Sequence, residues 1–381
     1  MNTPPSWSGS SLLVFKPRPS LPAPRQTVGI IGWLRTNLFN GWFNSLLTVI
    51  ALGLLWQTVP PLLSWAIFDA VWTGGSDACP PGYEGACWVF IFNKFRVLMV
   101  GLYPGDLFWR PMLAGGIFVT LAAVTVLRLM NPGKLIALWF LLPLPFYWLI
   151  AGGLGLTAVD QSLWGGLMLS LGLATIGVLI SLPLGILLAL GRRSNVAIVK
   201  SICVGIIEPV RGVPLITILF MASVMMPLFL PVGLNINNLL RVQIGIILFS
   251  AAYMAEVVRG GLQAISLGQY DAAKSLGLNY WKTTALIVLP QALRHVIPSL
   301  IGRCIALFKD TSLVIIVGLL DFLGMVKASA QDPEWLGHDT EAYVFCALVF
   351  WIICFSMSRY GRSLERQKDS DGITPRSAGQ A

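Results

Sequence analysis

The sequence predicts an all-α polytopic membrane protein with about eight transmembrane helices. Of its 381 residues, 56% are apolar or aromatic and only 11% are Asp, Glu, Lys or Arg, whereas soluble domains carry roughly 25% charged residues. The mean hydropathy is +0.75. Eight apolar runs approach the length of roughly 20 residues that a membrane-spanning helix needs. They cover residues 43–62, 111–127, 135–153, 164–190, 201–226, 242–258, 285–308 and 342–358.

The positive charges predict the orientation of these spans. The formal charge is +9, from 26 Lys and Arg against 17 Asp and Glu. With the N-terminus placed inside, eighteen of the cations fall on the cytoplasmic side and three lie within apolar runs. Five fall outside, namely Lys94, Arg96, Arg110, Arg241 and Lys327. Because cytoplasmic loops are enriched in Lys and Arg, we expect both termini to be cytoplasmic. The same rule accounts for the positive charge, so no nucleic-acid partner is expected.

Both ends of the chain are expected to lie outside the membrane. Residues 1–40 form the predicted cytoplasmic N-terminal tail. Its first 27 residues contain six prolines and no early apolar core, which favours disorder over a signal peptide. Residues 28–42 place several apolar residues near one helical face, the pattern of an interfacial helix. A second disordered tail is expected at 367–381.

The longest segment predicted outside the cell covers residues 64–110. It holds Cys79 and Cys87 in a compartment where disulfides form. A disulfide and two free thiols are both open, because geometry decides between them. The other four cysteines lie in apolar runs and are expected to pack as small apolar side chains. No Cys or His cluster has zinc or iron–sulfur spacing, so no metal is expected in this chain.

The segment 259–290 carries the motif that indicates function. It contains Asp271-Ala272-Ala273, then three residues, Gly277, nine residues and Ile287-Val288-Leu289-Pro290. The small alanine pair suits a short helix that packs closely against another surface. Gly277 permits a left-handed chain reversal, and Pro290 marks a break before the next span.

This pattern resembles the EAA loop of ABC-importer permeases, which reads Glu-Ala-Ala, three residues, Gly, nine residues, Ile-x-Leu-Pro. Asp271 stands where that family usually has Glu. Other elements are similar to the polar amino-acid permease family. They are Arg211-Gly212-Val213-Pro214, Tyr253-Met254-Ala255-Glu256 with Arg259-Gly260-Gly261, Gly268-Gln269, and Lys309-Asp310-Thr311-Ser312-Leu313.

The resemblance implies two parts of the membrane region. Residues 161–366 look like a five-helix type I ABC-importer permease core. Residues 41–160, with Cys87-Trp88 and Trp109-Arg110-Pro111, look like the three-span extension of the longer general L-amino-acid permease branch.

The resemblance also implies a complex in the bacterial inner membrane. Its other members would be a second, homologous permease, two copies of a cytoplasmic ATPase and a periplasmic binding protein that delivers L-amino acids. The helix around 268–277 would enter a groove of the ATPase and couple its closure to movement of the spans. The coupling residues would be Gly268, Gln269, Asp271, Ala272, Ala273 and Gly277.

The sequence contains no Gly-x-x-x-x-Gly-Lys-Ser/Thr phosphate loop. ATP and Mg²⁺ would therefore be bound by the partner ATPase. We expect this chain to be a non-catalytic subunit without a cofactor of its own.

Charged and helix-breaking residues inside apolar runs mark candidate positions along the substrate path, because a charge in the membrane is costly. The candidates are Glu208, Arg211, Gly212, Pro214, Glu256, Arg303, Lys309, Asp310, Thr311 and Ser312. Glu208 and Arg211 are close enough in sequence to pair on one helix face, beside a predicted helix break. A structural ion pair and a lining of the path are both open there. Glu256 and Arg259 repeat this spacing, and a structural or coupling role is favoured for them.

Arg303 is the residue that bears on substrate class. Related permeases often carry an acidic residue at the equivalent position, six residues before Lys309. A cation facing the path favours a carboxylate, so we expect neutral or acidic amino acids as cargo. Pairing of Arg303 with the second permease is the alternative. Thr311 and Ser312 fit helix packing as well as substrate contact.

Two other classes of function were weighed. An enzyme would need its catalytic groups in one site, but His295 and His338 are predicted to lie on opposite membrane faces. A secondary amino-acid transporter or channel subunit would show two similar halves or a coupling-ion site. The sequence shows no internal repeat, and the Asp-Ala-Ala loop would have no role. The transporter or channel subunit nevertheless stays the alternative.

Overall fold

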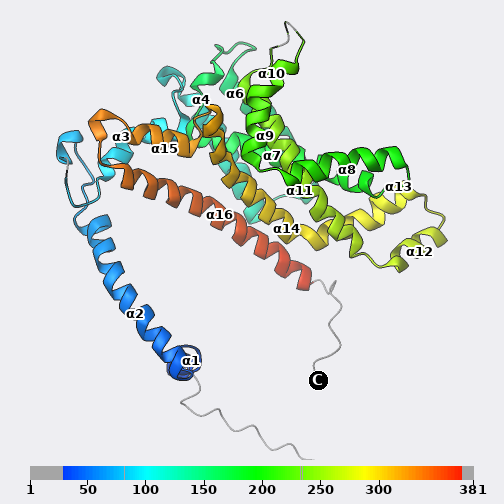
Figure 1. Ribbon diagram of the computed structural model, residues 1–381, viewed down its shortest axis with the longest axis horizontal. Helices are drawn as coiled ribbons and strands as arrows, with labels where there is room; N and C mark the ends of the chain where they lie inside the picture. Colours follow the sequence, from blue (N-terminus) through cyan, green and yellow to red (C-terminus); the bar gives the residue numbers. More distant parts are fainter. Residues whose placement is uncertain (1–28, 81, 232, 234, 371–381) are drawn as a thin grey trace, which may run out of the picture. The chain divides into compact units, whose positions relative to one another are not determined.

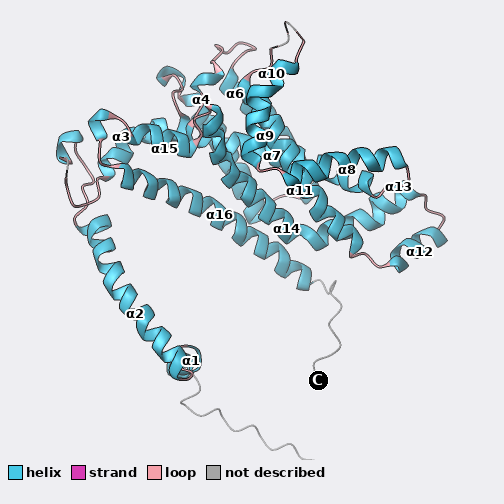
Figure 2. Cartoon of the chain, viewed as in Figure 1, coloured by secondary structure: helices cyan, strands magenta, loops and turns pink. Residues whose placement is uncertain are grey.

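The computed structural model describes residues 29–80, 82–231, 233 and 235–370, and this part of the chain is almost entirely helical (Figures 1 and 2). The described residues form isolated bridges but no β-strand. The prediction of an all-α membrane protein is therefore confirmed. The chain divides into two compact units, Met1–Ala70 and Val71–Ala381.

The first unit contains two helices joined by a short turn. α1 (Gly29–Asn37) occupies the position expected for an interfacial helix, and α2 (Trp42–Leu63) continues through a π-helical turn to Phe68. The Thr48 hydroxyl donates to the Leu38 carbonyl oxygen at 2.7 Å and so fixes the turn. α2 buries none of its side chains. An apolar helix of this length is what a lipid-facing span requires. The tail expected at residues 1–27 lies outside the described residues.

The second unit begins with the remainder of the N-terminal extension. Its helices are α3 (Trp88–Val100), α4 (Trp109–Leu127), α5 (Pro132–Leu141) and α6 (Pro143–Ala151). α4 and the α5–α6 pair correspond to the second and third predicted spans. Pro143 separates α5 from α6, because proline has no N–H to continue the helical ladder.

Helix α3 lies within the segment expected outside the membrane. It packs against α7, α15 and α16. Phe90 and Leu98 are fully buried in a cluster with Phe322 and Trp335. A disulfide between Cys79 and Cys87 closes the loop in front of α3. Helix α3 is therefore a folded part of the second unit that packs on its core.

The core follows from residue 166. Its main helices are α7 (Gly166–Arg192), α8 (Ala197–Gly212), α9 (Leu215–Phe220), α10 (Met226–Phe229), α11 (Asn238–Gln263), α14 (Leu289–Asp310), α15 (Phe322–Ala330) and α16 (Asp339–Ser370). α7 and α11 form the most extensive helix pair, and α14 packs between α11 and α16 (Figure 1). A Cβ atom at Gly185 would lie 2.8 Å from the Met254 Cβ atom. Glycine therefore allows the close approach of α7 and α11.

The predicted number of spans is approximate. Among the described residues, six helices are long and apolar enough to cross a membrane, and one bent helix pair raises this number to seven. The run at 285–308 forms α14, which is not among these helices because Arg294, His295 and Arg303 interrupt its apolar character. At the other end, α16 continues to Ser370, so the first residues of the expected C-terminal tail are helical. The rest of that tail lies outside the described residues.

Candidate functional site

The segment with the Asp-Ala-Ala motif forms a short helix between α11 and α14. α12 (Leu267–Ser275) ends in a left-handed turn at Gly277, where φ is +72°. The Gly277 N–H donates to the Lys274 carbonyl oxygen, and the Leu278 N–H donates to that of Ala273. These are the two hydrogen bonds of a Schellman motif. A side chain at this backbone conformation would be strained, so glycine fits the position.

Most of α12 is exposed, and large exposed apolar side chains stand at both of its ends. Ala273 is buried. The other motif residues are exposed, namely Gly268, Gln269, Asp271, Ala272 and Gly277. Leu267 and Leu276 are 79% and 77% exposed. Trp281, in the short helix α13 (Tyr280–Lys282), is 72% exposed. Large apolar side chains left this exposed are candidates for contact with another protein.

Five charged side chains form a network centred on Glu256. The network joins α7, α8 and α11. Arg192 Nη1 lies 2.8 Å from Glu256 Oε1. Arg259 Nη2 and Arg211 Nη1 lie 2.9 Å and 3.5 Å from Glu256 Oε2. Arg192 also reaches Glu208, at 2.7 Å from Nη2 to Oε1. Because the Glu256 side chain is only 13% exposed, these interactions are poorly screened by water.

This network is connected to α12 through the neighbouring residue Arg193. Its Nη1 atom donates to the Tyr270 hydroxyl on α12 at 3.4 Å and to the Leu262 carbonyl oxygen at 3.1 Å. On the other side, Gln291 Nε2 on α14 donates to Gln269 Oε1 on α12 at 3.1 Å. α12 is therefore held from α7 and from α14, while its exposed surface stays uncovered.

The pairing expected between Glu208 and Arg211 differs from the one found. Glu208 pairs with Arg192, and Arg211 pairs with Glu256. Side chains from α7 and α11 reach these two residues, and they replace the local partner that the spacing along α8 offers. The local pair of Glu256 with Arg259 is present, with Nε donating to Oε2 at 3.0 Å.

The helix break expected near Gly212 is confirmed. α8 ends at Gly212 and the chain resumes as a helix at Leu215, with Pro214 in the cap position. The helical segments before and after the break are bent by 110°. The break occurs where Arg211 joins the ion-pair network, so the bend lies directly beside the charges.

Arg303 and Arg211 both lie over the aromatic ring of Tyr253. The guanidinium carbon of Arg303 lies 4.4 Å from the centroid of the Tyr253 ring, and that of Arg211 lies 5.5 Å away. The Tyr253 hydroxyl donates to the Arg211 carbonyl oxygen at 3.3 Å. The Nε atoms of both arginines are buried and have no hydrogen-bond partner in the described part of the chain. Two guanidinium groups beside one ring concentrate positive charge, and guanidinium groups bind carboxylates.

The remaining candidates for the substrate path lie at the end of α14. Thr311 and Ser312 use their hydroxyls within the chain, donating at 2.8 Å to the carbonyl oxygens of Phe308 and Lys309 respectively. Hydrogen bonds to carbonyl oxygens in the last turn of α14 therefore account for both hydroxyls. Lys309 is exposed, while Asp310 is half-buried and interacts electrostatically with Arg303 without a salt bridge.

Sequence reasoning gave no individual role to Arg192, Arg193, Tyr253 or Tyr270. The two arginines counted only toward the orientation, because Glu256 and Tyr270, which they contact, lie more than 60 residues away along the chain. Tyr253 lies in one of the family-like elements, but nothing in the local spacing shows that two arginines contact its ring. Only the packing of α7, α8, α11 and α14 brings these groups together.

Comparison with known proteins identifies the family. Residues 181–369 match the family described as binding-protein-dependent transport system inner membrane component. The inner membrane amino-acid ABC transporter permease protein YhdY of Escherichia coli (strain K12) is 51% identical over 366 residues, covering 95% of this chain and 99% of the relative.

Two further similarities extend over different lengths. The glutamate/glutamine/aspartate/asparagine transport system permease protein BztC of Rhodobacter capsulatus is 40% identical over 420 residues, covering 92% of this chain and 96% of BztC. A crystal structure of an amino acid ABC transporter with histidines has 26% identity and a TM-score of 0.47, covering 53% of this chain and 92% of that one. The near-complete match to full-length relatives shows that the chain belongs to the amino-acid ABC transporter permeases, multi-pass components of the inner membrane.

Proposed function

We propose that this permease forms, with a second and homologous permease, the translocation path of an ATP-driven importer of L-amino acids. Two copies of a cytoplasmic ATPase would bind ATP and Mg²⁺, and a periplasmic binding protein would deliver the substrate. This chain would contribute one half of the path and one coupling surface. The observation that carries the proposal is the exposure of α12, with Asp271 on it and large apolar side chains at its ends.

Coupling to the ATPase would run through α12 into the membrane. Leu267, Leu276 and Trp281 provide the exposed apolar area that a partner protein buries. Arg193 and Gln291 tie the helix to α7 and α14. A displacement of α12 would therefore reach the network around Glu256, where α8 breaks.

A charge reversal on α12 tests this coupling. In proteoliposomes that contain the complete complex, we expect Asp271→Arg to lower ATP-driven uptake by about tenfold. An ATPase surface that is complementary to the Asp271 carboxylate would repel a positive charge at this position. Glu365→Arg, on the exposed surface of α16, is the matched control. Co-purification of the ATPase separates weakened assembly from weakened coupling. Normal uptake by Asp271→Arg would refute the coupling role of α12, and uptake without ATP would favour a secondary transporter.

The proposed cargo is neutral or acidic amino acids, with Arg303 contacting a carboxylate. The two guanidinium groups of Arg303 and Arg211 at the Tyr253 ring support this proposal. Support also comes from BztC, whose name lists glutamate, glutamine, aspartate and asparagine.

Replacement of Arg303 tests the substrate class. We expect Arg303→Ala to lower glutamate uptake by about tenfold or more, since a hydrogen bond to a charged group is worth roughly 1.5–3 kcal/mol. Alanine uptake should fall less, and arginine uptake should not fall. Arg303→Lys keeps the charge and should retain part of the glutamate uptake. An equal effect on all three amino acids would show that Arg303 does not select the cargo.

A further inference from the structure

Arg211 connects the network around Glu256 with the aromatic ring of Tyr253. Its Nη1 atom lies 3.5 Å from Glu256 Oε2, and its guanidinium carbon lies 5.5 Å from the centroid of the Tyr253 ring. The other arginines in the described part of the chain contact one of these two side chains or neither. The charged network and the candidate carboxylate site at the ring therefore share one side chain.

The contact from Arg211 is the longest of the three that Glu256 receives from arginines. Charge-assisted hydrogen bonds from nitrogen to oxygen are normally about 2.7–2.9 Å long, and the contacts from Arg192 and Arg259 measure 2.8 Å and 2.9 Å. Arg259 adds a second hydrogen bond, from Nε at 3.0 Å. Glu256 would therefore keep two close partners if the guanidinium group of Arg211 moved away.

The guanidinium group of Arg211 can be reached from outside the network. The Arg211 side chain is 34% exposed, against 13% for Glu256. Its backbone is held separately, because the Tyr253 hydroxyl donates to the Arg211 carbonyl oxygen at 3.3 Å. The chain then bends by 110° between Gly212 and Leu215. The side chain can therefore change its partner while the backbone before the bend stays in place.

Arg303 and Arg211 together suit a substrate with two carboxylates. Their guanidinium carbons lie 4.4 Å and 5.5 Å from the same ring centroid, so their separation cannot exceed the sum of these two distances. Arg303 forms no salt bridge with a described residue, whereas Arg211 pairs with Glu256. A carboxylate would thus bind Arg303 without competition, and it would bind Arg211 only in place of Glu256.

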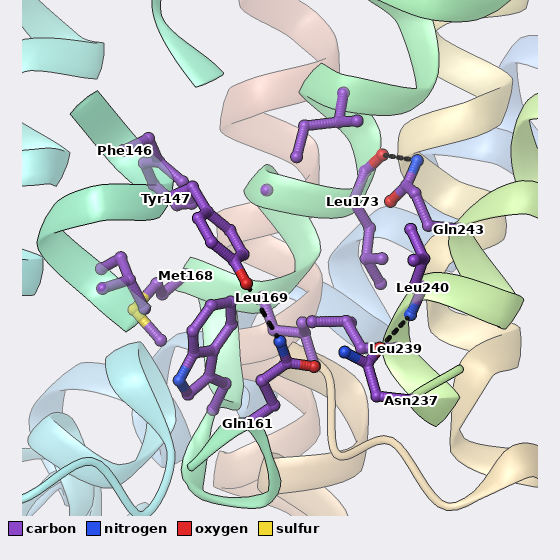
Figure 3. Close-up of a pocket in the computed structure, with 14 residues that line it drawn as sticks. Phe146, Tyr147, Gln161, Met168, Leu169, Leu173, Asn237, Leu239, Leu240 and Gln243 are labelled. Atoms are coloured by element: carbon purple, nitrogen blue, oxygen red, sulfur yellow. Dashed lines mark hydrogen bonds between the residues drawn. The ribbon is translucent and has the colours of Figure 1, made fainter. Parts of the chain in front are cut away.

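The cavity at the other end of α11 offers no such group. It encloses about 180 Å³ among α6, α7 and the start of α11. Gln161, Asn237 and Gln243 line it, but no charged side chain does (Figure 3). The Gln243 amide is already used, because its Nε2 donates to the Leu173 carbonyl oxygen at 3.3 Å. A carboxylate would find no cation there, which favours the arginines at the Tyr253 ring.

We propose that Arg211 exchanges the carboxylate of Glu256 for a carboxylate of the substrate, and that this exchange signals the presence of substrate to α12. The inference rests on the proposed importer function and its cargo. A ligand shifts an equilibrium only through contacts that differ between two states. Here the differing contact is the one from Arg211 to the substrate.

The signal would reach α12 through α7. Release of Arg211 leaves Glu256 to Arg192 and Arg259, and Arg193, beside Arg192, donates to the Tyr270 hydroxyl on α12. Coupling between two sites is reciprocal. A movement of α12 that strengthens the pair of Arg211 with Glu256 would therefore weaken the hold on the substrate and favour its release.

ATP hydrolysis measured against glutamate concentration tests the exchange. The complex of both permeases and the ATPase is placed in lipid nanodiscs, and the binding protein is left out so that glutamate acts on the permeases directly. We expect glutamate to stimulate hydrolysis in the wild type, and Arg211→Gln to abolish this stimulation at every concentration. Arg259→Gln is the matched control, because it removes a partner of the same carboxylate that does not contact the ring. It should keep the stimulation.

Two more variants keep the test decisive. Arg211→Lys keeps the charge but loses the guanidinium fork, so the half-maximal glutamate concentration should rise. Arg303→Ala should raise that concentration by about tenfold or more, the effect of losing a hydrogen bond to a charged group. It should leave the maximal stimulation unchanged, because Arg211 can still exchange partners at saturating glutamate.

The outcomes separate this exchange from the proposed cargo contact. A curve that Arg303→Ala leaves unchanged, with stimulation abolished in Arg211→Gln, would refute Arg303 as a cargo contact and still support the exchange. Stimulation that persists in Arg211→Gln, or that is lost equally in Arg259→Gln, would overturn the exchange. An unchanged curve for Arg211→Lys would overturn it even if Arg211→Gln fails to assemble, and so would a wild type that glutamate does not stimulate.

Discussion

At the scale of single residues, Glu256 forms salt bridges with three arginines. Three arginines lie within 4.0 Å of its carboxylate, and they come from α7, α8 and α11. Together with Glu208, which pairs with Arg192, this carboxylate offsets repulsion among three positive charges. Removing the carboxylate charge leaves the cations facing one another in a region of limited solvent access.

We expect Glu256→Gln to destabilise the protein by about 3 kcal/mol, because breaking one partner out of a largely buried charge group typically costs that amount. The midpoint of thermal unfolding in detergent should fall by several degrees. Glu365→Gln removes an exposed carboxylate on α16 and serves as the control. Equal midpoints for the two variants would show that the network contributes little to stability.

The same residues show what sequence spacing can and cannot predict. The pair of Glu256 with Arg259 lies within one helix, and its three-residue spacing predicts it. Glu208 and Arg211 have the same spacing but choose Arg192 and Glu256 as partners. A three-residue spacing predicts an ion pair only if no other helix brings a competing charge. Whether one does depends on the packing of helices that are far apart in the sequence.

At the scale of elements, α3 depends on contacts to the loop after α15. Lys94 on α3 forms a salt bridge with Asp332. The hydrogen bond from Lys94 is the main reason that the pKa of Asp332 is lowered, and the Glu334 backbone N–H adds to it. A carboxyl group with a lowered pKa stabilises the folded state above its ordinary pKa. This stabilisation is lost as the pH falls through the lowered value.

We therefore expect Asp332→Asn to lower the midpoint of thermal unfolding slightly at pH 7. The difference from the wild type should shrink as the pH falls below about 4, the ordinary pKa of aspartate. Lys94→Met should reproduce the effect, and adding Asp332→Asn to it should cause little further change. A difference that stays constant from pH 7 to pH 3 would contradict the role of the Asp332 carboxylate charge.

The elements also differ in how clearly the sequence predicts them. The long apolar runs of α4, α7, α11 and α16 could be read directly, because length and hydropathy define a span. The bend after Gly212 followed from its glycine and proline. Helix α3 has only 13 residues, too few to cross a membrane, and its burial comes from contacts with α7, α15 and α16. Short helices that rest on a core have no comparable signal in the sequence.

At the scale of the whole molecule, charge is distributed unequally between the two ends of the helices of the second unit. Arg192, Arg193 and Lys274 lie at the end that carries α12. Glu334 and Asp339 lie at the opposite end of α16 from its arginine-rich C-terminal turns. The positive-inside rule predicts that the α12 end lies in the cytoplasm, where an ATPase would meet it.

Cysteine labelling tests this orientation. Asn195→Cys lies in the exposed turn between α7 and α8, at the α12 end, and Asp339→Cys lies exposed at the start of α16. With a membrane-impermeant maleimide added to whole cells, we expect Asp339→Cys to react at once and Asn195→Cys to react only after permeabilisation. The wild type gives the background from its free cysteines, Cys203, Cys304, Cys346 and Cys354. The reverse pattern would place α12 outside the cell, where a cytoplasmic ATPase could not reach it, and would remove the basis for coupling through Asp271.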